Sequence, residues 1–173
     1  MGYAQYIERP FTKIELYARA LARQFEETAR AAGLGDEFWN DCANILELGA
    51  GQGIVVLALS YLTPTDCKIK TVDIEIPIHS EVVKKMGERL ESHLDQTIVD
   101  FLASYAYAKF DLLTLINVGN YHGITDANLL AKVLKPKGVV LDCMTNLPQR
   151  IMTPTFRLIE ANRSKVWVLK EDN

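Results

Sequence analysis

The sequence predicts a three-layer, doubly wound α/β fold: a mostly parallel sheet between two layers of helices, ending in an antiparallel hairpin and preceded by an extra helix. Three features predict it. Short apolar runs alternate with helical stretches over most of the chain. A turn of alternating glycines joins the first apolar run to the next helix. The last two strand-like runs are too close together for a parallel return, which needs a crossover connection.

The extra N-terminal helix is predicted over residues 10–32. Apolar side chains recur there at steps of three and four residues, as on one face of an amphipathic helix: Phe11, Ile14, Ala18, Leu21, Phe25 and Ala29. Pro10 is acceptable in the first turn of a helix, and the sequence Gly33-Leu34-Gly35 ends it.

The predicted parallel strands are apolar on both faces, as expected for strands that are covered on both sides. They are placed at residues 45–48, 69–74, 97–99, 110–116 and 139–141. The helices between them are expected at residues 52–62, 80–94 and 125–134. In the second of these helices, Val83, Met86, Leu90 and Leu94 should face inward, and Thr125 should cap the third. The hairpin is expected at residues 155–160 and 165–170.

The glycine turn carries the main functional signal. Gly49, Gly51 and Gly53 follow the first strand, and the next helix begins directly after them. Glycine has no Cβ and tolerates positive φ, so backbone amides can approach a ligand closely, beside the positive end of the helix dipole. A dinucleotide motif would need its third glycine where Ile54 stands. The spacing therefore predicts a nucleotide-like ligand other than a dinucleotide.

A polar residue stands at the end of each predicted parallel strand. In chain order these residues are Glu47, Asp73, Asp100, Asn117 and Asp142. Ligands of open α/β sheets bind outside the carboxyl ends of the strands. Carboxylates there would accept hydrogen bonds from a ligand rich in hydroxyl and amino groups, and the charge strengthens such bonds.

Glu47 and the three glycines form E-x-G-x-G-x-G, which resembles the first motif of class I S-adenosylmethionine-dependent methyltransferases. Five α/β units followed by a hairpin also resemble that family's fold, a seven-stranded sheet whose last strand runs antiparallel. The resemblance covers about residues 44–170 of a single domain, 1–173, in which residues 1–40 form an N-terminal helical cap. It implies S-adenosylmethionine as the cofactor.

The resemblance also implies a role for each motif residue. Glu47 and the turn, with Gly49, Ala50, Gly51 and Gly53, would cradle the methionine part of the cofactor. Asp73, followed by Ile74, resembles the acid that receives the ribose hydroxyls, and Glu75 competes for that role two positions later. Asp100 and Phe101 resemble the acid and apolar pair beside the adenine.

Residues 117–123, after the fourth predicted strand, form the candidate acceptor site. Methyltransferases that act on nucleobase or glutamine nitrogens carry Asp/Asn-Pro-Pro-Tyr/Phe there. Asn117 fits the first position and is assigned to the cofactor as well, but both prolines are missing and Tyr121 comes one residue late. This departure argues against nucleobase methylation. His122 is the candidate general base because its reference pKa lies near neutrality; the alternative is that Tyr121 and His122 only pack or cap the loop.

Composition bounds the partners. The chain has 173 residues, 49% apolar and 24% charged, as in an ordinary globular domain. A net charge of −3 argues against nucleic acid as the main partner. The longest apolar stretch, residues 54–62, is too short to span a bilayer. Three scattered cysteines indicate reduced thiols in the cytoplasm and no zinc site.

The sequence thus predicts a cytoplasmic methyltransferase, without a metal, that methylates an oxygen or nitrogen of a small-molecule acceptor. Two alternatives stay open. One is a non-methylating enzyme on the same fold, such as an aminopropyl transferase, and the other is a non-catalytic S-adenosylmethionine-binding module. A homodimer is also left open.

Overall fold

A computed structural model describes residues 8–105, 109–116, 124–143, 147–161 and 164–170. Its centre is a seven-stranded sheet in the order β3-β2-β1-β4-β5-β7-β6. The strands are β1 (Asn44–Leu48), β2 (Lys68–Val72), β3 (Leu90–His93), β4 (Phe110–Ile116), β5 (Leu134–Cys143), β6 (Phe156–Ala161) and β7 (Ser164–Leu169). The helices are α1 (Phe11–Ala31), α2 (Glu37–Asp41), α3 (Ile54–Leu62), α4 (Ser80–Met86), α5 (Ile98–Ser104), α6 (Asn128–Ala131) and α7 (Gln149–Met152).

The pairing of the strands confirms the predicted fold class. β1 pairs in parallel with β2 and β4, β2 with β3, and β4 with β5. β7 is antiparallel to both β5 and β6, so the chain ends in a hairpin at the sheet edge. The order of the strands reverses between β1 and β4, and the carboxyl ends of these strands are where such sheets bind ligands.

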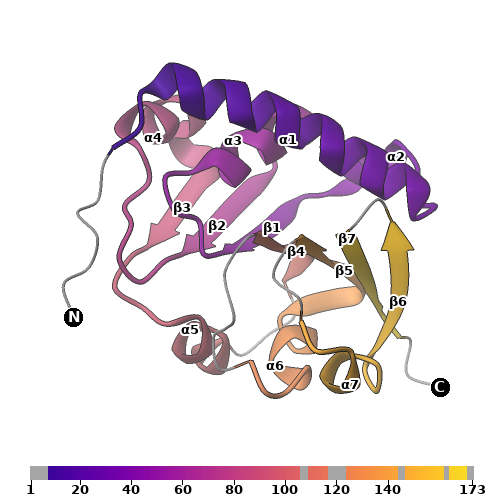
Figure 1. Cartoon of the computed structure of the whole chain (residues 1–173). Helices are drawn as coiled ribbons and strands as arrows, with labels where there is room; N and C mark the ends of the chain where they lie inside the picture. The colour runs from indigo at the N-terminus through magenta and orange to yellow at the C-terminus, as the bar shows by residue number, and fades with distance from the viewer. Residues whose placement is uncertain (1–7, 106–108, 117–123, 144–146, 162–163, 171–173) are drawn as a thin grey trace.

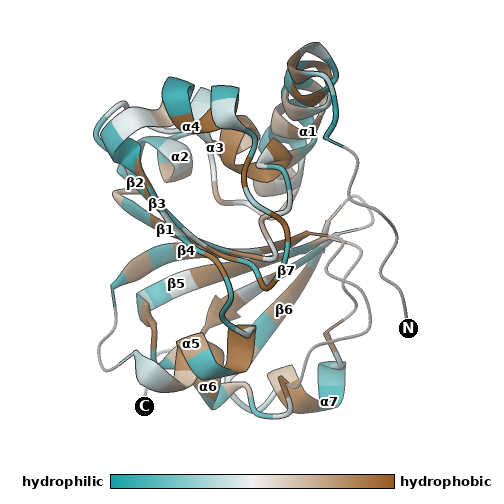
Figure 2. Ribbon diagram, turned by 90° about the vertical axis from the view of Figure 1, so that its left-hand side faces the viewer, coloured by the Kyte–Doolittle hydropathy of each residue, from teal (hydrophilic) through white to brown (hydrophobic). Residues whose placement is uncertain are grey.

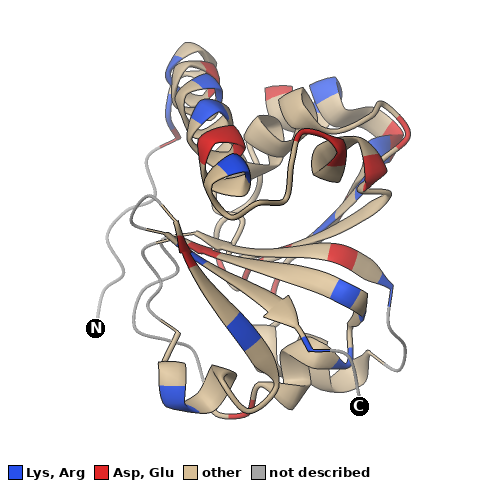
Figure 3. Cartoon of the chain, turned by 90° about the vertical axis from the view of Figure 1, so that its right-hand side faces the viewer, with Lys and Arg blue, Asp and Glu red and all other residues tan. Residues whose placement is uncertain are grey.

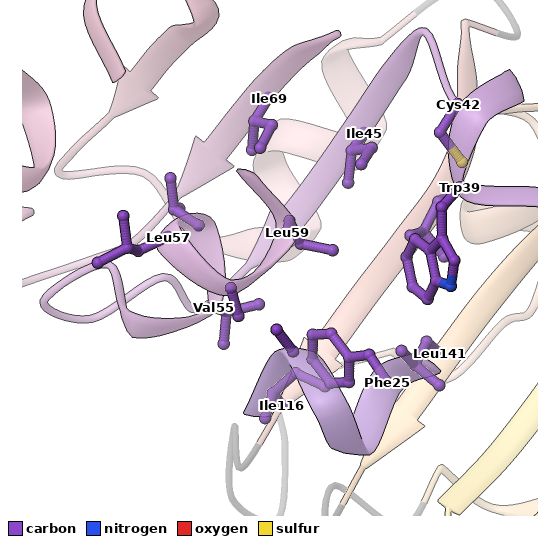
Figure 4. Packing of buried hydrophobic residues seen from close by; sticks show 14 of the residues in the cluster. Phe25, Trp39, Cys42, Ile45, Val55, Leu57, Leu59, Ile69, Ile116 and Leu141 are labelled. Carbon is purple, nitrogen blue, oxygen red and sulfur yellow. The ribbon is translucent and has the colours of Figure 1, made fainter. Parts of the chain in front are cut away.

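The sheet separates two hydrophobic cores. Helices α1 to α4 cover one face and α5 to α7 the other (Figure 1). On the first face, Phe25 of α1 stacks on Trp39 of α2 above Ile45 and Leu141 of the sheet (Figure 4). On the second face, Leu46, Leu113 and Trp167 are buried. Apolar residues therefore run through the strands and the inner sides of the helices (Figure 2).

Helix α1 confirms the predicted amphipathic helix. Ile14, Ala18, Phe25 and Ala29 are buried against the core, while acidic and basic residues alternate on the solvent side (Figure 3). On that solvent side, Glu15 contacts Lys85 of α4 at 3.0 Å. Thus α1 lies across α3 and α4, beside the carboxyl ends of the central strands.

The third strand lies elsewhere than predicted. The helix expected over residues 80–94 ends at Met86, and β3 begins at Leu90 after a short 3₁₀ turn. Gly87 has φ of +53°, a conformation that favours glycine and ends the helix. Val82 is buried instead of Val83, and Leu94 is exposed. The segment expected as the third strand, residues 97–99, instead begins α5.

Smaller differences concern the short helices and the fifth strand. The helix expected over residues 125–134 is reduced to the four residues of α6, and Thr125 does not cap it, because its N-cap is Ala127. The fifth strand, in turn, begins at Leu134 and is longer than expected. Helices α2 and α7 have only five and four residues, too few for a periodic apolar pattern.

Candidate functional site

A cavity of about 1070 Å³ opens at the carboxyl ends of the central strands. Its walls include the glycine turn after β1 with the start of α3, residues 72–76 at the end of β2, residues 96–98 at the start of α5, one side of α1, and Arg9 and Ile116. Pockets for small organic ligands are commonly about 300–1,000 Å³. The cavity therefore has room for a nucleotide-sized molecule at the place where the sequence predicts it.

The glycine turn has the backbone that its sequence requires. Gly49, Gly51 and Gly53 all have positive φ, at 82°, 49° and 90°. A Cβ on Gly51 would meet nothing within 4 Å, whereas a Cβ on Gly53 would lie 2.8 Å from a methyl carbon of Ile78. Gly51 also lines the cavity. The two glycines therefore differ: Gly53 allows α3 and α4 to pack closely, and Gly51 keeps the ligand side of the turn free of a side chain.

Asp73 connects the glycine turn to the turn after β2. Its Oδ2 accepts the backbone N–H of Gly51 at 2.8 Å, and its Oδ1 accepts those of Glu75 and Ile76, both at 3.0 Å. A carboxylate has about four acceptor positions. Three of these positions hold the two turns, so about one is left to accept a hydroxyl group from a ligand in the cavity, which Asp73 lines together with Glu75.

Apolar side chains flank this acid. Ile74 lines the cavity and is 54% exposed, an unusual exposure for a large aliphatic side chain. Gln96, Thr97 and Ile98 line the cavity from the segment that precedes α5. This part of the cavity combines carboxylates with apolar and amide groups, which suits a flat heterocycle attached to a hydroxyl-bearing sugar.

Asp100 and Phe101 do not line the cavity, because their segment is helical. Thr97 is the N-cap of α5: its Oγ1 accepts the backbone N–H of Asp100 at 3.1 Å and donates to the Asp100 carboxylate at 2.6 Å. Phe101 is buried beside Tyr105 and His93. From this segment the cavity is lined by Gln96, Thr97 and Ile98.

Glu47 is buried within the sheet and is not among the cavity-lining residues. Its Oε2 accepts the hydroxyl of Thr114 on the neighbouring strand β4, while its Oε1 has no partner among the described residues. Burial raises the pKa of Glu47 well above its usual value, and the charge of Asp73 adds to the rise. The carboxyl group of Glu47 therefore lies inside the sheet, before the glycine turn, and does not line the cavity.

Glu47→Gln should make the protein more stable near neutral pH. The raised pKa means that the unfolded chain ionises first as the pH rises above 4.5, while the folded chain keeps the proton. Within that window the wild type loses about 1.4 kcal/mol of stability per pH unit through this group. Urea unfolding should give equal stabilities near pH 4.5 and a more stable variant near pH 7. An equal difference at both pH values would contradict the buried neutral carboxyl.

The three candidate catalytic residues, Asn117, Tyr121 and His122, lie outside the described residues. Asp142, at the end of β5, is buried and accepts the backbone N–H of Leu147 at 3.0 Å. Cys143 is buried too, with its Sγ 3.1 Å from the Ser164 hydroxyl, and burial raises its pKa to about 11. Neither residue is among those that line the cavity.

The N-terminal helix forms one wall of the cavity. Tyr17, Ala20, Leu21 and Gln24 of α1 line it, together with Arg9 from the segment just before the helix. Of these residues the sequence pattern identified only Leu21, as part of the apolar face of the helix. The described residues contain no His, Cys, Asp and Glu group that could hold a metal ion, and no helix among them is long and apolar enough to cross a membrane.

Comparison with known proteins supports the fold. No protein-family model matches the sequence, and no curated protein matches it. Among solved structures, an O-methyltransferase from Bacillus cereus in complex with SAH has a TM-score of 0.60 at 13% identity, covering 96% of this chain and 94% of its own. A methyltransferase from Geobacter sulfurreducens has a TM-score of 0.57 at 10% identity, covering 96% and 92%. Cofactor-bound Rv0187 from MTB has 0.58 at 15%, covering 95% and 92%.

Proposed function

We propose that this chain, which has the fold of class I S-adenosylmethionine-dependent methyltransferases, is such an enzyme. It would transfer the methyl group of S-adenosylmethionine to an oxygen or nitrogen of a small-molecule acceptor. Two of the similar structures hold SAH or a cofactor, and two more carry O-methyltransferase in their names, which supports both the cofactor and the reaction.

The observation that carries the proposal is the junction between Asp73 and the glycine turn. Asp73, which follows β2, accepts the N–H of Gly51, which follows the neighbouring strand β1, and both residues line the same cavity. A ribose placed against Asp73 would find a charged acceptor, and its base would lie between Ile74 and Ile98. Gly49 and Gly51, both with positive φ, leave the amino-acid end of the cofactor next to backbone instead of side chains.

Methyl transfer needs little more from the protein than placement. The bound cofactor supplies an activated methyl group on a sulfonium, and orientation of the acceptor in line with it can contribute about 7–11 kcal/mol. Ile116, the last described residue of β4 before residues 117–123, lines the cavity. A base among residues 117–123 is required only if the acceptor must lose a proton.

Release of S-adenosylhomocysteine tests the proposed reaction. The purified protein, supplied with S-adenosylmethionine, is expected to release it when small phenols, carboxylates or amines are offered as acceptors. Formation of methylthioadenosine with a polyamine acceptor would indicate aminopropyl or related transfer instead. Cofactor binding without any turnover over the whole panel would favour a non-catalytic binding module.

His122→Ala should separate base catalysis from placement. If His122 takes the acceptor's proton, the variant should lose about 10²–10⁴-fold in kcat with unchanged cofactor affinity. Asn117→Ala is the matched variant at the other end of the loop, and it should have the larger effect if placement dominates. Turnover that stays at the wild-type level in His122→Ala would remove this residue from the mechanism.

A further inference from the structure

Arg9 gives one wall of the cavity a positive charge. It is the only lysine or arginine among the described residues that line the cavity, and it belongs to the segment before α1. Asp73 and Glu75 line the cavity from the segment after β2. A ligand with hydrogen-bond donors at one end and an anion at the other would therefore bind in one orientation.

The backbone around Arg9 is tied to the glycine turn. The Arg9 N–H donates to Oε1 of Gln52 at 3.0 Å, and the preceding residue, Glu8, lies 3.3 Å from Nε2 of His79. Nδ1 of His79 accepts the backbone N–H of Glu81 at 3.1 Å, which leaves Nε2 facing Glu8. These contacts hold Arg9 beside the turn that the proposed cofactor would touch.

The guanidinium of Arg9 extends toward Tyr17 of α1, and no described carboxylate forms an ion pair with it. It lies over the ring of Tyr17, 5.9 Å from the centroid, and pairs with no carboxylate in the part of the chain that the structure describes. Tyr17 lines the same cavity and is 49% exposed. Arg19, within α1 and ten residues after Arg9, differs: it lies over Tyr61 at 4.9 Å and is paired with Glu15 at 3.3 Å.

We propose that Arg9, supported by the face of Tyr17, is the recognition residue for a carboxylate of a small molecule bound in the cavity. A planar guanidinium binds a carboxylate through two parallel hydrogen bonds, and these are stronger than bonds between neutral groups. The carboxylates Asp73 and Glu75 would repel an anion elsewhere along the lining. This inference rests on the proposed function, in which the carboxylate belongs to the cofactor's amino-acid end or to an acidic acceptor.

Calorimetry with two nucleosides tests the first source. S-adenosylhomocysteine carries the carboxylate, and 5′-methylthioadenosine lacks the whole amino-acid part. Arg9→Gln should bind the former about tenfold more weakly and the latter as the wild type does. Arg19→Gln is the matched control, because Arg19 also lies over a tyrosine ring but does not line the cavity, and it should leave both affinities unchanged. A wild type that binds neither nucleoside would contradict the proposed function itself.

A second titration tests the other source. Benzoate and inorganic phosphate are added to wild type and Arg9→Gln that are saturated with S-adenosylhomocysteine. If Arg9→Gln retains its affinity for S-adenosylhomocysteine but loses binding of either anion, Arg9 serves an acidic acceptor. If nucleoside affinity is unchanged and the anions bind both proteins equally or not at all, the proposal is wrong while the proposed function stands.

Discussion

Asp73→Ala is expected to weaken S-adenosylmethionine binding by at least about 1.5–3 kcal/mol, the range for hydrogen bonds to a charged group. The ribose hydroxyls would lose their acceptor. The variant also loses the bonds from Gly51, Glu75 and Ile76, so both turns that line the cavity lose their common anchor. Calorimetry against wild type measures the loss, and a thermal unfolding scan reports how far the loosened turns lower stability.

Glu75→Ala is the matched control for this prediction. Glu75 is an exposed acid two residues away on the same wall, and only its backbone bonds to Asp73. The Glu75→Ala variant should therefore bind the cofactor nearly as well as the wild type does. If Glu75→Ala weakened binding and Asp73→Ala did not, Glu75 would be the ribose acid and the role given to Asp73 would be wrong.

Gly51→Val should abolish detectable cofactor binding while the protein still folds. A Cβ at Gly51 meets no protein atom, so the added side chain would enter open space at the cavity wall and not the core. The positive φ of 49° makes the variant somewhat less stable, by about 1–3 kcal/mol. Calorimetry should therefore show no cofactor binding, while circular dichroism should still show a cooperative unfolding transition at a somewhat lower free energy of unfolding.

Gly53→Ala is the contrasting variant. Its Cβ would lie 2.8 Å from Ile78 and 3.0 Å from Val82, at a φ of 90°. Overpacking of this kind costs about 1–3 kcal/mol in addition to the strain of the left-handed backbone. Its unfolding free energy should fall more than that of Gly51→Val. Retained cofactor binding in Gly51→Val would show that Gly51 serves the turn alone.

Much of the fold could be predicted because apolar runs on both faces mark a buried parallel strand. β1, β4 and the terminal hairpin lie within two residues of their predicted limits, and α1 within one. The third strand could not be placed in this way. Leu90 and Leu94 continue the helical spacing of Met86, yet the helix ends between Met86 and Leu90, at Gly87. The apolar spacing of a helix therefore continues in the sequence after the helix itself has ended.

A signal for the start of α5 was nevertheless present in the sequence. Thr97-Ile98-Val99-Asp100 has the spacing of a capping box, and the structure shows the bonds between Thr97 and Asp100. The β-branched Ile98 and Val99 favoured a strand instead. As a result, the sequence pointed to Asp100 and Phe101 in this segment, whereas the residues of it that line the cavity are Gln96, Thr97 and Ile98.

The glycine turn and Asp73 could be predicted because backbone geometry and a strand-end acid leave a local sequence pattern. The buried position of Glu47 could not be predicted. It depends on the register of β1 against β4, which places this side chain opposite Thr114 in the sheet interior. Arg9 and the flank of α1 also depend on tertiary packing, because only the docking of α1 over α3 brings them to the cavity.

Calorimetric titration of the wild-type protein with S-adenosylmethionine, S-adenosylhomocysteine and NAD tests the central claim most directly. The glycine spacing, Asp73 and the cavity together predict saturable binding of both sulfur compounds and no measurable binding of NAD. Tighter binding of NAD than of either sulfur compound, or no binding of any of the three, would contradict the assignment of this cavity to S-adenosylmethionine.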